Sequence, residues 1–180
     1  MRRLHNRSRA RFRHSQLRPS VHRVLHYEGE GDPSADVVHD LDGDGRGELV
    51  LTDRHFEYVN DLCFACSPIL SLVICDTNGT FADCTMQFPD GLQNDLRRAD
   101  ERLNLNASDD TVAGTKYRRG GVLGVYLVHA LLDGEQRAWN AVSARLTEPD
   151  RVWLSVARSR AQAWVANRLR ALDVKTDAVQ

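Results

Sequence analysis

The chain has 180 residues, of which 42% are hydrophobic and 27% are charged, so its composition predicts one globular domain and excludes wholesale disorder. Its 12 glycines and 5 prolines exclude collagen-like and linker-dominated sequence. The longest strongly apolar run, residues 122–132, is shorter than the about 20 residues that cross a bilayer, so we expect no membrane span. The formal net charge of −1 gives no overall attraction to nucleic acid or to membranes.

Residues 1–24 differ from the rest of the chain because they carry eight arginines, three histidines and no acid. We expect a basic, disordered arm. The alternative is a tail that binds nucleic acid or an acidic protein through its positive charge. The paired Arg2 and Arg3 are not followed by the apolar stretch of an export signal, so none is predicted here.

From residue 21 to residue 88 the apolar residues form short clusters separated by turn residues, which is typical of strands. The expected strands are residues 23–27, 35–39, 48–52, 69–75 and 80–86. Between the last two, Thr77-Asn78-Gly79-Thr80 predicts a hairpin, because asparagine and glycine tolerate the positive φ of tight turns.

From residue 90 to residue 173 the apolar spacing becomes helical. One helix presents Leu92, Leu96, Ala99 and Leu103 on a single face. Residues 122–132 are apolar nearly all round and predict a buried central helix, and further helices are expected over 137–146 and 151–172, the last with Asp150 as its N-cap. The sequence therefore predicts an α+β domain over residues 25–175, with a small antiparallel β part (25–88) followed by a helical part (90–173).

The strongest functional signal is an acidic, glycine-rich loop between two expected strands. It reads Asp40-Leu41-Asp42-Gly43-Asp44-Gly45-Arg46-Gly47-Glu48. Acids recur at loop positions one, three, five and nine, with glycine at six, so that alternate side chains can aim oxygens at one centre. Hard oxygen ligands favour Ca²⁺. The expected ligands are the side chains of Asp40, Asp42, Asp44 and Glu48 and the backbone carbonyl of Arg46.

This loop is not an EF-hand, because position twelve is Leu51 instead of a bidentate glutamate and a strand follows. A strand–loop–strand with this pattern resembles the calcium loop of the FG-GAP repeat family over about 15 residues. The resemblance implies the same five ligands, although Glu48 stands where aspartate is more usual. No second copy of the loop is present, so a multi-blade propeller is excluded and we expect a single calcium-binding loop in another fold.

Two other interpretations of the loop stay open. The segment around Asp40 and Asp42 also resembles the first motif of haloacid-dehalogenase-like phosphatases, which implies a Mg²⁺-dependent enzyme with Asp40 as nucleophile and Asp42 as general acid. In that family a threonine or valine is expected at Asp44, and a later lysine must come from Lys116 or Lys175. The remaining interpretation is a solvated acidic turn that binds nothing.

Four cysteines, Cys63, Cys66, Cys75 and Cys84, lie within 22 positions. Disulfides, free thiols and a zinc site are the alternatives, and the simplest disulfide joins Cys63 or Cys66 to a strand cysteine. Their even number beside a calcium loop favours disulfides in an oxidising compartment. Arginine outnumbers lysine 22 to 2, which indicates a GC-rich, bacterial genome.

These observations favour a non-enzymatic, calcium-binding interaction protein that works in the periplasm or outside the cell. The phosphatase and the binder acting through residues 1–24 are the alternatives. We expect an unidentified protein partner or self-association through the helical part, where all three tryptophans fall. Trp164, flanked by Arg160 and Arg168 at helical spacing, is the candidate for that surface.

Overall fold

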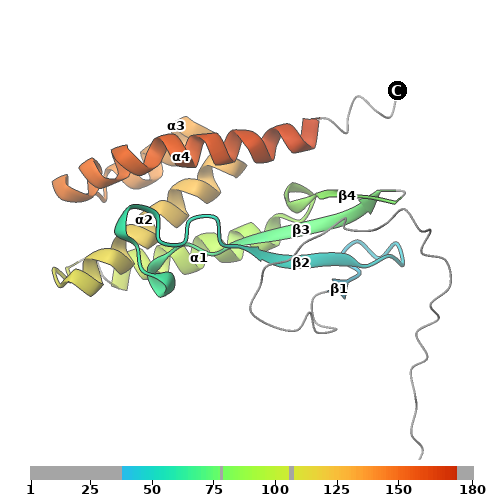
Figure 1. Cartoon of the computed structure of the whole chain (residues 1–180), viewed down its shortest axis with the longest axis horizontal. Coiled ribbons are helices and arrows are strands. Elements are labelled where there is room, and N and C mark those ends of the chain that lie inside the picture. The colour runs from blue at the N-terminus through green and yellow to red at the C-terminus, as the bar shows by residue number, and fades with distance from the viewer. Residues whose placement is uncertain (1–37, 78, 106–107, 174–180) are drawn as a thin grey trace, which may run out of the picture. The chain divides into compact units, whose positions relative to one another are not determined.

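The computed structural model describes residues 38–77, 79–105 and 108–173. The chain divides into two units, residues 1–32 and 33–180, and all described residues belong to the second. The basic arm, the expected strand at 23–27 and residues 35–37 lie outside the described residues. Within the described part, a four-stranded antiparallel sheet is followed by four α-helices, which confirms the predicted α+β class (Figure 1).

The strands are β1 (Val38–His39), β2 (Glu48–Asp53), β3 (Leu70–Thr77) and β4 (Thr80–Asp83), which pair in chain order. The hairpin is confirmed, because Thr77 pairs with Thr80 and Gly79 has a φ of 87°. The last strand is shorter than predicted. Asp83 accepts hydrogen bonds from the backbone N–H and the hydroxyl of Thr85, and this cap turns the chain into a 3₁₀-helix, η4 (Thr85–Gln87).

The helices are α1 (Pro89–Leu105), α2 (Val112–Leu132), α3 (Glu135–Ser143) and α4 (Glu148–Asp173). α2 contacts the three others and is the buried central helix that the sequence predicted (Figure 1). Asp150 is not the N-cap of α4, because the helix begins earlier and the hydroxyl of Thr147 accepts from the Asp150 N–H at 3.3 Å. In the described part of the chain, no helix is long and apolar enough to cross a membrane.

The main hydrophobic core lies among the helices and the segment that joins β2 to β3. That segment contains two 3₁₀-helices, η2 (Val59–Asp61) and η3 (Phe64–Cys66), and contributes the buried side chains Phe56, Val59, Leu62 and Cys66. Of the described strand residues, only Leu70 belongs to this core. The opposite end of the sheet, which carries the acidic loop, therefore depends on other interactions for its stability.

Trp164 lies in this core and is not a surface residue. It is 7% exposed, packs edge-on against the Phe56 ring, and donates from Nε1 to the Asp53 carboxylate at 3.1 Å. Arg168 stacks on the indole, as its helical spacing predicts, but is itself 8% exposed. The prediction of an interaction surface at Trp164 is therefore wrong, because the segment between β2 and α1 covers the side of α4 that carries Trp164.

Three glycines of α2 let neighbouring elements approach the helix closely. A Cβ on Gly120 would lie 1.7 Å from the carbonyl oxygen of Cys66, and one on Gly121 would lie 2.8 Å from that of Ala99. A Cβ on Gly124 would lie 2.7 Å from the Ala99 Cβ. α1 and η3 can reach the α2 backbone only because these positions carry no side chain.

We predict that Gly120→Ala destabilises the protein by about 3 kcal/mol, because the Cys66 carbonyl is backbone and cannot move aside without shifting the core. Gly91→Ala in α1 is the matched control, since its Cβ would meet only the Ser71 side chain, at 3.1 Å. It should stay within about 1 kcal/mol of the wild type because alanine favours the helix. Urea denaturation followed by circular dichroism measures both; equal losses would contradict the close packing.

A buried ion cluster joins the starts of α2 and α4. Asp150, 1% exposed, accepts from Arg118 Nε at 2.8 Å, from Arg119 Nε at 3.1 Å and from the Thr147 hydroxyl at 2.8 Å. Burial acts to raise the pKa of the Asp150 carboxyl, but these hydrogen bonds outweigh it and hold the pKa below its usual value of 3.8. The cluster therefore stabilises the fold while Asp150 is ionised.

Because the pKa of Asp150 is depressed in the folded state, its carboxylate contributes fully to the free energy of unfolding above about pH 5. This contribution is lost as the pH falls through the folded pKa. We predict that Asp150→Asn lowers the free energy of unfolding at pH 7 and loses less stability than the wild type between pH 5 and pH 2. Glu148→Gln, which removes an exposed acid on the same turn, should follow the wild-type profile. Urea titrations across this pH range decide it; parallel wild-type and Asp150→Asn profiles would refute the assignment.

Candidate metal site in the β1–β2 loop

The acidic loop is the turn of the β1–β2 hairpin. His39 pairs with Glu48, so the strands close directly below residues 40–47. Gly43 and Gly45 have φ values of 77° and 86°, which lie in the left-handed region that favours glycine. The predicted strand–loop–strand is therefore present, and the two glycines of the pattern stand where the turn requires them.

Side-chain oxygens of the acids hold the loop backbone in its turn. The Asp40 carboxylate accepts from Gly43 N–H at 2.8 Å and from Gly45 N–H at 3.1 Å. Glu48 accepts from Leu41 N–H at 2.8 Å, across the base of the loop. These bonds fix where the acids at both ends of the loop point, and each carboxylate keeps lone pairs for a further ligand.

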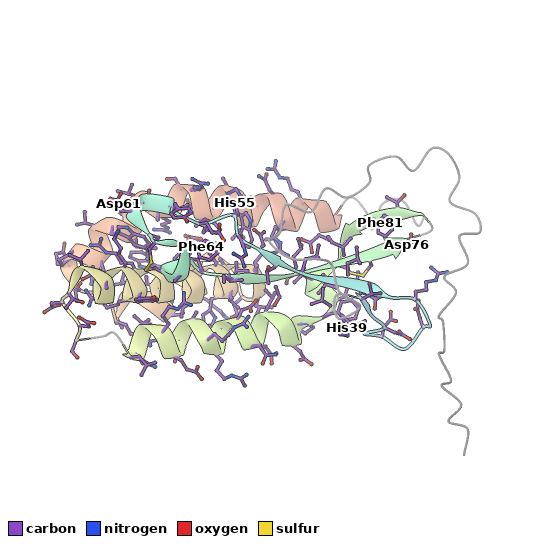
Figure 2. The ribbon with its side chains drawn as sticks, turned by 60° about the horizontal axis from the view of Figure 1, so that its bottom comes forward. His39, His55, Asp61, Phe64, Asp76 and Phe81 are labelled. Atoms are coloured by element: carbon purple, nitrogen blue, oxygen red, sulfur yellow. A yellow bond between two sulfur atoms is a disulfide. The ribbon has the colours of Figure 1, made fainter. Side chains whose placement is uncertain are left out.

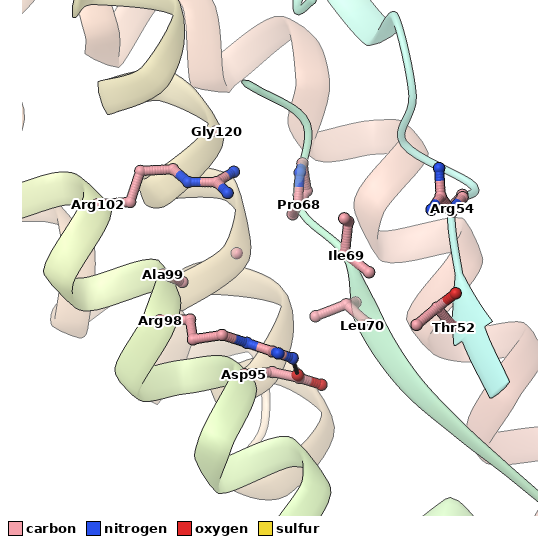
Figure 3. A pocket seen from close by; sticks show the side chains of 11 residues that line it. Thr52, Arg54, Pro68, Ile69, Leu70, Asp95, Arg98, Ala99, Arg102 and Gly120 are labelled. Atoms are coloured by element: carbon pink, nitrogen blue, oxygen red, sulfur yellow. Dashed lines mark hydrogen bonds and ion pairs between the residues drawn. The ribbon is translucent and has the colours of Figure 1, made fainter. Parts of the chain in front are cut away.

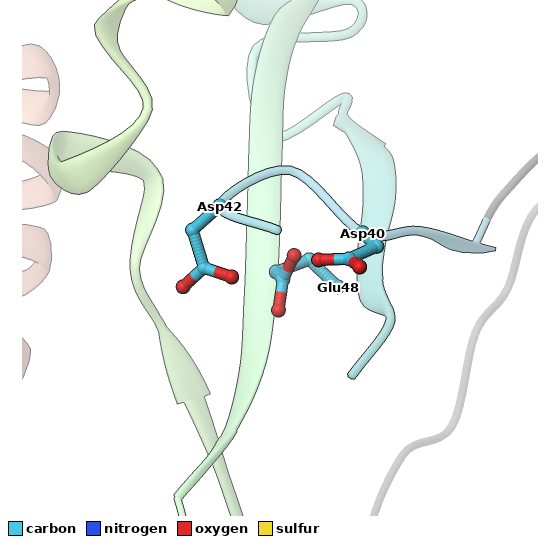
Figure 4. Close-up of side chains that lie close together, drawn as sticks. All are labelled: Asp40, Asp42 and Glu48. Carbon is cyan, nitrogen blue, oxygen red and sulfur yellow. The ribbon is translucent and has the colours of Figure 1, made fainter. Parts of the chain in front are cut away.

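Three of the predicted ligands come together. One carboxylate oxygen each of Asp40, Asp42 and Glu48 lie within 4.8 Å of one another (Figure 4). Oxygens that share one Ca²⁺ at 2.3–2.6 Å are at most about 5 Å apart, so this spacing fits a single ion. Without a cation, two unit charges at this separation repel by roughly 1 kcal/mol in water and about 3 kcal/mol near a protein surface. The donor set suits a hard divalent ion.

Asp44, another predicted ligand, is not part of this group of acid side chains. Asp44 accepts from the Arg46 N–H at 2.7 Å, and its other oxygen lies 4.0 Å from Arg46 Nε. Its carboxylate is therefore engaged by the next turn of the loop. The assignment of Asp44 and of the Arg46 carbonyl as ligands stays a prediction.

Burial differs sharply within the acidic group. Glu48 is 4% exposed, whereas Asp40 and Asp42 are open to solvent. Figure 2 shows His39 at this end of the sheet, with Asp76 and Phe81 of the neighbouring hairpin, while His55 and Phe64 lie at the helical end. A buried carboxylate facing two exposed ones gives the group one fixed ligand and an open side for ion entry.

The phosphatase interpretation of the same residues fits the local structure less well. The segment after the loop is β2, whereas that family needs a helical or cap segment after its first motif. The sheet of the described residues is wholly antiparallel. The catalytic roles for Asp40 and Asp42 therefore gain no support from the surrounding elements.

The four cysteines form two disulfides, so the disulfide prediction is confirmed and free thiols and zinc are excluded for them. The pairing is local, and the expected link from Cys63 or Cys66 to a strand cysteine is wrong. Cys63 and Cys66 bracket one turn of η3 with Cα atoms 4.9 Å apart, and Cys75 and Cys84 lie across the β3–β4 hairpin at 5.9 Å. Both separations suit a disulfide.

Comparisons with models of protein families, with curated proteins and with solved structures find no match to this chain. Its function must therefore be argued from its own residues.

We predict that the denatured double variants Cys63→Ser/Cys66→Ser and Cys75→Ser/Cys84→Ser contain no free thiol, because each removes one complete pair. The mixed variant Cys63→Ser/Cys75→Ser is the control and should contain two. Loss of the Cys75–Cys84 link should cost about 2–3 kcal/mol by the loop-entropy relation. Thiol counting and urea denaturation measure these effects. Two free thiols in either paired variant would overturn the connectivity.

Proposed function

We propose that this chain is a non-enzymatic binding protein that holds one Ca²⁺ in the loop between β1 and β2. The observation that carries the proposal is the approach of the Asp40, Asp42 and Glu48 carboxylates to within 4.8 Å. Calcium accepts six to eight oxygen ligands in flexible geometry, so Asp44, the Arg46 carbonyl and water can complete the set. The ion would neutralise the repulsion among the acids and fasten β1, a strand of two residues, to β2.

The proposal places the protein outside the cytoplasm. Two disulfides support this setting, because disulfides persist in oxidising compartments and are rare in the reducing cytosol. Extracellular calcium sites bind with dissociation constants of about 10⁻⁴ to 10⁻³ M, which suits one small loop with an exposed side. Binding of a partner through residues 1–24 concerns residues outside the described part and stays a separate prediction.

We predict that millimolar Ca²⁺ raises the melting temperature of the full chain relative to EDTA. An ion that binds only the folded state at 10 to 100 times its dissociation constant adds roughly 1.4 to 2.7 kcal/mol, or about 3–11 °C for a domain of this size. Mg²⁺ should give a smaller shift because it dehydrates reluctantly and demands octahedral geometry. Differential scanning calorimetry with each ion measures the shifts.

Asp40→Asn should abolish the calcium shift, because it removes one charge from the acidic group while its amide oxygen can still accept from Gly43. Asp76→Asn is the matched control. Asp76 accepts from Gly79 N–H at 2.6 Å with the same three-residue spacing, but in the β3–β4 hairpin. Asp53, the acid at the far end of β2, is not used as a control because its carboxylate accepts a hydrogen bond from Trp164 in the core. Identical melts in EDTA and Ca²⁺, or an equal loss in both variants, would refute the calcium site.

A further inference from the structure

A pocket of about 370 Å³ lies between α1 and the helical end of the sheet (Figure 3). Its walls come from the end of β2, the start of β3 and one face of α1, and its floor includes Gly120 and Gly124 of α2. Both glycines are buried, and the Cys66 carbonyl and the Ala99 side chain pack against them. The volume lies within the range of small-molecule sites.

The charge of the lining is predominantly positive. Arg54 from the sheet side and Arg98 and Arg102 from α1 contribute three guanidinium groups, whereas Asp95 is the one acid among the lining residues. Asp95 is 2% exposed, and both its oxygens are engaged, by Arg98 and by the Ser71 N–H at 2.5 Å. A ligand in the pocket therefore meets more cationic than anionic groups, and the single carboxylate is already paired with Arg98 and Ser71.

Arg102 is held in the pocket wall by the backbone of the segment that contains Cys66 and Ser67. Its Nη1 donates to the carbonyl oxygens of Cys66 and Ser67 at 3.1 and 3.0 Å. Burial lowers the pKa of Arg102 and the nearby Arg98 charge lowers it further, although Tyr117 acts in the opposite direction. Arg98 and Arg102 both line the pocket from α1, so an anion bound there would be attracted by two positive charges.

Arg54 closes the other side. It forms an ion pair with Glu57 at 3.1 Å and lies over the Phe64 ring, 4.9 Å from its centre. The aromatic contact holds the guanidinium plane at the rim and leaves donors of its fork available to a ligand. The lining also includes four apolar residues, Pro68, Ile69, Leu70 and Ala99.

From this arrangement we propose that the pocket binds a small organic anion, with a carboxylate or phosphate head between the arginines and a short apolar body against Pro68 and Ile69. The guanidinium fork matches both head groups because each offers paired oxygens to two parallel N–H donors. This site is separate from the acidic loop, which lies at the other end of β2.

The test is a titration of the full, uniformly ¹⁵N-labelled chain followed by NMR. Benzoate and phenyl phosphate are the probes for the two head groups, and benzyl alcohol is the neutral probe with the same ring. We expect at least one anion to move the amide signals of Gly120 and Gly124 in a saturable way, with those of Gly79 and Gly134 unmoved. Which anion binds more tightly identifies the head group.

Arg54→Gln should weaken binding about tenfold or more, because it removes a charged hydrogen-bond donor. Arg97→Gln is the control. This substitution also removes one positive charge, but Arg97 lies on α1 and does not line the pocket. If Arg54→Gln does not fold, Arg98→Lys replaces it; this variant keeps a cation for Asp95 but loses the planar fork. The proposal is overturned if neither anion moves the two glycine signals, if benzyl alcohol moves them as much, or if the Arg97 variant binds as weakly.

Discussion

The close approach of the Cys66 carbonyl to α2 at Gly120 is the constraint on which the helical half depends. No side chain fits between them, so the segment from β2 to β3 lies directly on the central helix. The Cys63–Cys66 disulfide and the hydrogen bonds from Arg102 to Cys66 and Ser67 hold that segment in place. Gly120 also lines the arginine-lined pocket, so the residue that permits this contact belongs to the walls of the cavity as well.

The two ends of the sheet are stabilised by different physics. At the helical end Leu70 joins a core of large apolar side chains, and hydrophobic burial dominates. At the loop end the strand residues contribute little to that core. The Cys75–Cys84 disulfide and the ion pair of Arg168 with Asp83, at 2.9 Å, fasten β4 there. Burial acts to raise the pKa of Asp83, but the hydrogen bonds from Arg168 and Thr85 outweigh it and lower the pKa. Covalent and electrostatic links thus reinforce this end, where Val73, Ile74 and Cys84 are buried outside the main core.

The sequence predicted features that depend on residues close together in the chain, and it failed for contacts between distant residues. Helix α1, residues 122–132 of α2 and the two hairpins were predicted because apolar spacing, apolar runs and turn glycines are local signals, whereas the first ten residues of α2 were not predicted. The disulfide pairing was not, since spacing alone leaves the three connectivities of four cysteines open. Trp164 was assigned to the surface because its partners, Phe56 and Asp53, are more than 100 positions away in the chain.

The same limit separates the two candidate sites. Asp40, Asp42 and Glu48 occupy one turn, so their spacing in the sequence already places them together. Arg54 follows β2, whereas Arg98 and Arg102 lie on α1 more than 40 positions later. In the sequence, Arg98 and Arg102 look like ordinary surface arginines of an amphipathic helix. Only the packing of α1 beside β3, which depends on small residues of α2, brings them to one cavity. A site assembled by tertiary packing leaves no motif in the sequence.

β2 links the two sites physically, but we expect them to be energetically independent. Its six residues span about 20 Å, with Glu48 at the acidic loop and Asp53 next to Arg54 of the pocket. Between these ends, residues 49–53 pair with β3 in continuous register, and Asp53 is anchored separately by Trp164. An ion that orders the loop would act on β1 and on the first residue of β2, before this register begins. Free energies of changes more than about 10 Å apart without shared partners usually add. Occupation of the loop should therefore leave the affinity of the pocket unchanged, because the anchor at Asp53 fixes the pocket end of the strand whether or not the loop holds an ion.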